Sequence, residues 1–464
     1  METLTTPRVM LSGIREGAGK KLLATGLIHE LRRRGISISC VVRDSCLLQT
    51  AVFRRLAGRY CICLDSHLLD DSQMLYQSYM AGVGADLILV TGKGGLYDGN
   101  SPGDLKGSDA ELAELTLTPI ILLVDGQGWG NSLVALIKGY FDYGEGLKFI
   151  GACLNKLKRD NQGCPTPSID FFNRCLKEAS LGELIGAVPA VSLEADLPPA
   201  DVCQSKVFTS LPRSFFVELG NLVNKFIDID LLIERAETAS SLRLENLTYS
   251  PLPRRTRIAV SDDSCFNICF QDNLVLLKYF GAEIVPFSPL ADQKIPAGSA
   301  GVYLTGGALG EYATAISNND LMLKAIREFA NSGGVIFSEG AASALLCDKY
   351  IINGDQYPGV GVIPAAATLK QPKQSYFESI TMEDSILGPP GLVLRGIDTR
   401  EFSLSGPDRA VMVLQMKYPD GEKHFGGFSP GAQIVSSFGF CHMGSNPVVA
   451  RHLVDACEVN SKLG

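Results

Sequence analysis

The sequence predicts an α/β fold made of two doubly wound domains. Short aliphatic runs such as RVMLSG (8–13), DLILVTG (86–92) and PIILLVDG (119–126) are separated by stretches of helical length. Continuous apolar strands that alternate with helices are typical of parallel sheets buried on both faces. The chain of 464 residues exceeds one ordinary core, and its 48 glycines suit tight turns between strands and helices.

The first domain is expected to hold a mostly parallel sheet. Its first strand, 8–13, is followed by a glycine-rich turn and by a helix over 21–34, where leucine and isoleucine recur at helical spacing. Further strands are expected at 36–42 and 149–156, in addition to the two aliphatic runs between them. We therefore assign residues 1–236 to this domain.

A polar linker is expected over 237–256, because this segment ends in a proline- and arginine-rich stretch. The second domain is then predicted over 257–464. It opens with the strand 257–260 and continues with the strand-like runs AEIVPF, GVYLTGG, GGVIFSEG and AVMVLQM.

Composition excludes several classes of protein. The net charge of −8 argues against non-specific binding to nucleic acid. The N-terminus has no apolar signal core and no apolar run reaches about 18 residues, so no membrane segment is expected. The 13 cysteines lack the spacing of a zinc site, and reduced, buried thiols predict a cytoplasmic protein.

A phosphate-binding loop is expected after the first strand, in the sequence GIREGAGKK (13–21). Gly13, Gly17 and Gly19 would let backbone N–H groups converge on phosphate oxygens, and Lys20 would supply positive charge. Five residues separate Gly13 from the Gly-Lys pair, where the usual loop has about four. A plain glycine-rich turn with an exposed lysine is the alternative.

Several motifs resemble those of cobyrinic acid a,c-diamide synthases. The longer loop is similar to the variant of dethiobiotin synthetase, and GLYDG (95–99) resembles the matching segment of the diamide synthases. Residues 257–292 resemble the entry into their glutaminase domain, and HMGSNPVVARHL (442–453) resembles a segment near the end of the family's sequences. The resemblance implies a P-loop NTPase-like first domain, a class I glutaminase-like second domain, and ATP-dependent amidation of corrin carboxylates with ammonia from glutamine.

The metal side of the first site departs from this family. Lys21 stands where the family has a threonine that holds Mg²⁺, and Thr91 stands where it has a glutamate. Lys93 replaces an apolar residue, while Cys46 and Gln49 stand where aspartates belong. A hard cation needs oxygen ligands, so we expect no metal site and little use of Mg²⁺. Neutral drift of an unused surface is the alternative.

Two retained residues favour ATP as a ligand. Asp125 follows a strand where the family positions groups around the phosphates, and Asn155 matches an asparagine that resembles an adenine reader. A buried structural asparagine is the other interpretation of Asn155.

The glutaminase-like site lacks its nucleophile. The family reads Ala-Glu-Cys-Gly-Gly, whereas this chain has Gly340 at the cysteine position. Cys347 lies too far along the helix to replace it and is interpreted as a core thiol. Arg400 and Ser403 replace two histidines, and a later His-x-His motif reads Phe-Cys-His, so only His442 survives. We expect no catalytic residue here, because a histidine alone has nothing to activate.

Two hypotheses for function follow from different classes. The first is a non-catalytic protein of tetrapyrrole metabolism that binds a nucleotide, a tetrapyrrole, an intact homologue or a second copy of itself. The second is an ATP-dependent amidoligase that uses free ammonia or ammonia from a partner. The losses at both sites favour the first hypothesis, and the Gly-Lys core of the loop favours the second.

Overall fold

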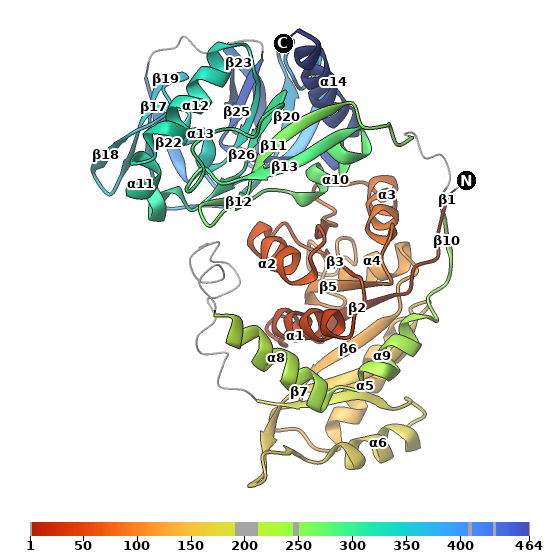
Figure 1. Cartoon of the computed structure of the whole chain (residues 1–464). Coiled ribbons are helices and arrows are strands. Elements are labelled where there is room, and N and C mark those ends of the chain that lie inside the picture. Colours follow the sequence, from red (N-terminus) through yellow and green to blue (C-terminus); the bar gives the residue numbers. More distant parts are fainter. Residues whose placement is uncertain (1, 191–211, 245–249, 407–410, 430–432, 464) are drawn as a thin grey trace. The chain divides into compact units, whose positions relative to one another are not determined.

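The computed structural model describes residues 2–190, 212–244, 250–406, 411–429 and 433–463 (Figure 1). The described residues form two compact units, divided between Leu244 and Ser250. Each unit is built on its own sheet with helices around it. The prediction of two α/β domains is confirmed.

The first unit contains a parallel sheet in the strand order β4-β3-β5-β2-β6-β7-β9. Every residue of β2 is buried, as expected for a central strand covered on both faces. A short antiparallel strand, β8 (Pro165–Thr166), pairs with the end of β7. The parallel strands are β2 (Arg8–Gly13), β3 (Ile38–Val42), β4 (Ile62–Cys63), β5 (Leu87–Gly95), β6 (Ile120–Asp125), β7 (Phe149–Arg159) and β9 (Leu184–Pro189).

Side-chain caps and close packing set the helices of this unit. Asp70 and Gln73 form a capping box at the start of α3, which satisfies two N–H groups. Gly26 lets α1 lie against α8, because a Cβ there would stand 2.6 Å from Val223. The described helices are α1 (Lys20–Arg33), α2 (Leu47–Ala57), α3 (Asp71–Gly82), α4 (Asp109–Leu115), α5 (Ser132–Tyr143), α6 (Ile169–Glu178), α8 (Arg213–Phe226) and α9 (Ile229–Ala236).

Part of the segment interpreted as a linker belongs to the first unit. Strand β10 (Leu242–Leu244) pairs antiparallel with β1 (Glu2–Leu4). The buried guanidinium of Arg8 donates to the carbonyls of Thr116 and Ser240, which attaches the same segment to the sheet. Residues 245–249 lie outside the described residues, and β11 begins at Thr256.

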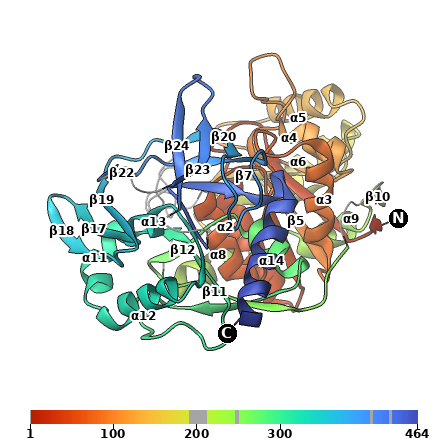
Figure 2. The same cartoon turned by 90° about the horizontal axis from the view of Figure 1, so that it is seen from above.

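The second unit contains a mixed sheet. Its parallel half has the order β13-β11-β14-β16-β25, and the antiparallel half continues as β24-β23-β20-β21-β26. The hairpin of β23 and β24 extends from the unit in Figure 2. The strands are β11 (Thr256–Ser261), β13 (Ala282–Phe287), β14 (Gly301–Leu304), β16 (Val335–Glu339), β20 (Ser375–Thr381), β21 (Val393–Asp398), β23 (Val411–Lys417), β24 (Lys423–Ser429), β25 (Ile434–Ser437) and β26 (Gly439–His442).

Smaller elements surround this sheet. Strands β17, β18, β19 and β22 form a separate sheet, and β12 pairs with β15. Their bounds are β12 (Phe266–Ile268), β15 (Gly306–Gly307), β17 (Cys347–Ile352), β18 (Asp355–Pro358), β19 (Ile363–Leu369) and β22 (Phe402–Ser405). The helices are α10 (Gln271–Tyr279), α11 (Leu309–Ser317), α12 (Asp320–Asn331), α13 (Ala341–Leu345) and α14 (Pro447–Leu463). No helix in the described parts of the chain has the length and apolarity needed to cross a membrane.

Candidate functional site

The glycine-rich loop connects β2 to α1 in a conformation that needs glycine. Gly17 has φ of 72° and Gly19 has φ of 98°, both in the left-handed region. Gly19 is the N-cap of α1, and no side chain caps the first turn. The N–H groups of that turn are therefore available to an anion, which the helix dipole also favours.

Lys20 lies inside the loop and is only 5% exposed. Its ammonium donates to the carbonyl of Gly94, and to the carbonyl of Arg15 at 3.3 Å. Burial lowers the pKa of Lys20, and the charge of Asp109 opposes that shift. The loop lysine is thus held by two backbone oxygens, and a phosphate in the loop would have to replace them.

Asp125 and Asn155 both contact the loop, at the ends of β6 and β7. The amide of Asn155 donates to the carbonyl of Ala18 at 2.9 Å. Asp125 forms an ion pair with Arg15, and the ammonium of Lys156 lies 3.9 Å from its carboxylate. The structure therefore brings both predicted residues to the loop, where they bind protein groups. The contact of Asn155 agrees with its structural interpretation.

A hollow adjoins the loop between α1 and α8. It is small and partly open to solvent, and its lining is apolar apart from the loop and the one amide. The lining residues are Gly19, Leu22, Leu23, Asn155, Val188, Leu219, Leu222 and Val223.

The metal side of the site holds cations and buried polar groups without partners. Thr91 Oγ1 and Gln49 Nε2 are buried with no hydrogen-bond partner in the described structure. Lys93 Nζ lies 3.4 Å from Asp44, so its charge is offset. Lys93 therefore adds little net positive charge to this side of the site. Among the described residues, no three His, Cys, Asp or Glu side chains gather closely enough to hold a metal ion.

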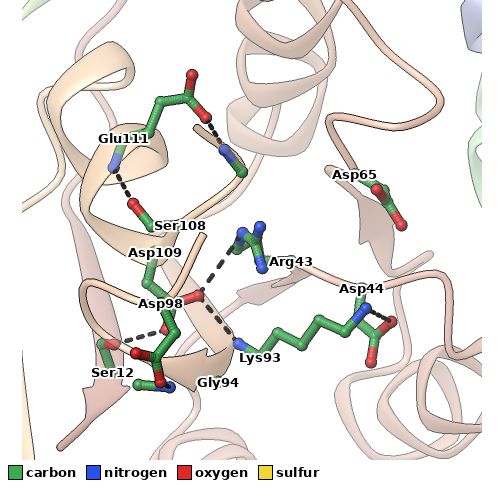
Figure 3. A network of polar contacts seen from close by, with 12 residues as sticks. Ser12, Arg43, Asp44, Asp65, Lys93, Gly94, Asp98, Ser108, Asp109 and Glu111 are labelled. Atoms are coloured by element: carbon green, nitrogen blue, oxygen red, sulfur yellow. Dashed lines mark hydrogen bonds and ion pairs between the residues drawn. The ribbon is translucent and has the colours of Figure 1, made fainter. Parts of the chain in front are cut away.

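Sequence reasoning missed two residues here, Arg43 and Asp109. Arg43 follows β3 and is 8% exposed, and its Nε lies 3.7 Å from the fully buried carboxylate of Asp109 at the start of α4. Asp109 also accepts from Ser12 Oγ at 2.6 Å and from the N–H of Lys93 at 3.0 Å (Figure 3). Burial raises the pKa of Asp109, and Arg43 opposes the shift. Arg43 could have been noticed in the sequence, because it directly follows a predicted strand, and ligands of parallel sheets bind at the carboxyl ends of the strands.

The second site keeps the backbone of a nucleophile turn. Gly340 lies between β16 and α13 with φ of 56° and ψ of −133°, a conformation that residues with side chains rarely adopt. A Cβ at Gly340 would lie 2.4 Å from the ring of Phe440, and a Cβ at Gly306 would lie 2.4 Å from the same ring. Phe440 therefore fills the space that a nucleophile would use.

Phe440 is the first residue of the former His-x-His motif, so the pair that should be cysteine and histidine is glycine and phenylalanine. The sequence alone showed that the cysteine and the histidine are replaced, but it did not show that positions 340 and 440 are in contact. A Cβ at Gly307 would lie 1.7 Å from the carbonyl of Cys265. Glycine at this turn is thus required by the pairing of β12 with β15.

His442 is completely buried behind this site. Its Nδ1 accepts from the N–H of Gly444 at 3.1 Å, and its Nε2 lies 3.7 Å from the buried carboxylate of Asp272. Glu339 precedes Gly340, and burial raises its pKa to about 8. These contacts anchor the strand ends and give solvent no route to the imidazole, since His442 has no exposed surface.

The remaining predicted positions lie in structural settings. Cys347 is buried, and burial raises its pKa to about 12, which leaves the thiol unreactive. The Arg400 guanidinium lies 4.3 Å from the centre of the Tyr418 ring. Ser403 pairs with Thr368 in the side sheet.

Comparison with known proteins agrees with this arrangement. A family model described as the CobB/CobQ-like glutamine amidotransferase domain matches residues 257–402. The cobyrinate a,c-diamide synthase of Syntrophotalea carbinolica is 27% identical over 99% of this chain and 100% of its own length. That of Listeria innocua is 26% identical over 97% and 99%. The hydrogenobyrinate a,c-diamide synthase of Streptomyces coelicolor is 25% identical over 98% of each chain.

The likeness to these synthases extends over both units and preserves the order of segments, from the phosphate loop to the C-terminal helix. The second unit alone accounts for the amidotransferase match. The chain belongs to the cobyrinate a,c-diamide synthase family.

Proposed function

We propose that this chain is a family member that has lost glutaminase activity and binds a nucleotide polyphosphate, or a similar polyanion, in its first unit. One observation carries the first part: the ring of Phe440 occupies the space where a side chain on Gly340 would stand. Amide transfer from glutamine needs a thiolate that forms a glutamyl thioester, and no thiol stands at this turn.

The first unit supports the binding part of the proposal. Its loop keeps left-handed glycines, an uncapped helix start and a buried lysine. Lys21 stands where the family has a threonine that holds Mg²⁺, and Thr91 stands where it has a glutamate. Arg43 lies next to Thr91, because its backbone N–H donates to the Thr91 carbonyl. The cations Lys21 and Arg43 repel Mg²⁺ and attract phosphate oxygens, so binding is expected to depend little on Mg²⁺.

The relatives suggest the wider setting. Their names describe synthases that act on cobyrinate and hydrogenobyrinate. We place this chain in the same tetrapyrrole metabolism, with a tetrapyrrole carboxylate, an intact homologue or a second copy as the partner. The second candidate is an ATP-dependent amidoligase that uses free ammonia. The Gly-Lys core of the loop favours it, and a retained catalytic metal would be required.

The glutaminase part is tested by glutamate release from glutamine. The purified chain should give no turnover above a buffer blank. Turnover that disappears in His442→Ala would overturn the proposal, because His442 is the one histidine retained from the family motifs.

The binding part is tested by calorimetric titration with ATP, with Mg²⁺ and with EDTA. Binding should persist in EDTA and fall by about tenfold or more in Lys20→Ala, since charge-assisted bonds to the loop lysine are lost. An affinity that collapses in EDTA would contradict the proposal, as would the absence of binding. Amide formation from ATP, ammonia and a cobyrinate substrate would instead establish the ligase.

A further inference from the structure

We propose that Arg43 provides the positive charge that neutralises the bound polyphosphate in place of a metal ion, and that the buried carboxylate of Asp109 holds Arg43 ready and limits the affinity. This inference rests on the proposed function, because it concerns the same site. It assigns roles to two residues that the family motifs do not mark.

The position of Arg43 is the first support. It follows β3 at the carboxyl edge of the sheet, and its N–H donates to the carbonyl of Thr91 at 3.0 Å on the next strand, β5. Thr91 stands where the family has its metal-side glutamate. The backbone therefore places Arg43 beside the metal position, and the side chain is 8% exposed.

Asp109 connects Arg43 with the loop lysine. Arg43 lies 3.7 Å from its carboxylate, and Asp109 and Lys20 each shift the pKa of the other through their charges. One buried carboxylate thus lies between the two most buried cations of the site. Ser12 and the N–H of Lys93 fix it by hydrogen bonds of 2.6 and 3.0 Å (Figure 3).

A buried hydroxyl next to Arg43 has no hydrogen-bond partner. Thr91, whose carbonyl accepts from the Arg43 N–H, has a buried Oγ1 without a partner among the described residues. A buried donor without a partner costs about 1–3 kcal/mol, so a ligand that reaches it is favoured. A phosphate oxygen at this place would accept from the Thr91 hydroxyl and from the guanidinium.

Asp109 has two opposite effects on an anion. It orients Arg43, but its negative charge competes with phosphate for both cations. Removal of that charge should therefore tighten binding, because an anion a few ångströms from a carboxylate is repelled in a low dielectric. A purely structural role for Asp109 predicts the reverse, since loss of the ion pair would loosen the site.

The experiment is titration of the full chain with ATP in EDTA. Arg43→Gln should weaken binding by about tenfold or more, and Asp109→Asn should tighten it by about threefold or more. Arg55→Gln is the matched control, because Arg55 is an exposed arginine of α2 in the same unit. Its affinity should equal that of the unmodified chain.

The double variant Arg43→Gln, Asp109→Asn separates charge from folding. It removes both members of the pair, so neither is left buried alone. Binding should stay weak in the double variant; recovery to the unmodified affinity would show that Arg43 acts only by pairing with Asp109. Unchanged binding in Arg43→Gln, or weaker binding in Asp109→Asn, would also overturn the inference. No binding by the unmodified chain would instead refute the proposed function itself.

Discussion

Single residues decide what the second unit can do. Gly340 retains a backbone conformation that suits a nucleophile, whereas Phe440 packs against it where the family has a histidine. Either change alone would disable the site. The two positions pack against each other, so a side chain restored at Gly340 alone would collide with the Phe440 ring.

Gly340→Cys should therefore restore no glutaminase activity and should destabilise the second unit by about 1–3 kcal/mol, because its Cβ would lie 2.4 Å from the Phe440 ring. Adding Phe440→Ala should recover most of that stability. Denaturant titration compares the three proteins. Equal stability of Gly340→Cys and the unmodified chain would show that the ring moves aside freely.

Gly340→Cys with Phe440→His should return a reactive thiol. A cysteine at the start of α13 next to a histidine has a lowered pKa, so it alkylates faster at neutral pH than in the Phe440→Ala pair. Mass spectrometry of the peptide that contains residue 340 measures the rate and ignores the other thiols. Equal rates in the two double variants would mean that position 440 does not face the thiol.

Glu339 predicts a pH dependence of stability. Its carboxylate accepts from Tyr303 and from the N–H of Cys441, and burial raises its pKa from 4.5 to about 8. The folded state thus binds the proton more tightly than the unfolded state. The stability contributed by protonation is complete below pH 4.5 and is lost as pH rises through 8.

Glu339→Gln should accordingly lose less thermal stability than the unmodified chain between pH 6 and pH 9, values chosen to bracket the shifted pKa. Glu383→Gln, at an exposed position of the same unit, is the control and should follow the unmodified chain. A steeper loss in Glu339→Gln would show that the carboxylate is ionised and stabilising in the folded chain.

At the scale of elements, the sequence predicted the central strands well and the site poorly. The aliphatic runs 8–13 and 119–126 contain β2 and β6. A continuous apolar strand must be covered on both faces, so such a run predicts a central strand of a parallel sheet. The pairing of Arg43 with Asp109 depends on two segments that are 66 residues apart in the chain, 109 − 43. Short sequence motifs describe residues that are close in the chain, so they cannot predict such a contact.

Helix packing gives a prediction with opposite signs at two glycines. A Cβ at Gly26 would lie 2.6 Å from Val223 and 2.8 Å from the carbonyl of Leu219, so Gly26→Ala should destabilise the first unit by about 1–3 kcal/mol. Gly139, in α5, has no atom within 4 Å of its Cβ position. Gly139→Ala should stabilise by about 0.5–1 kcal/mol through helix propensity. Denaturant unfolding measures both, and loss of stability in both would contradict this packing.

At the scale of the molecule, strand order explains which distant residues meet, and charge compensation is what the sequence leaves undetermined. The phosphate loop, Asn155 and Asp125 meet as expected, because strand order brings carboxyl ends of parallel strands to one edge. The positive charge of Lys93 is offset, since Asp44 pairs with Lys93. Local sequence cannot show such compensation, because the partner comes from another strand end.

The two units should respond separately to ligand and to mutation. Each has its own sheet and core, so two unfolding transitions are expected on heating. ATP in EDTA should raise only the transition that Gly26→Ala lowers, because a ligand stabilises the state that binds it. Gly340→Cys should lower only the other transition. Calorimetry of the unmodified chain, Gly26→Ala and Gly340→Cys, with and without ATP, assigns each unfolding transition to one unit. If ATP raised the transition that Gly340→Cys lowers, the polyphosphate site would belong to the second unit and the loop in the first unit would be a relic.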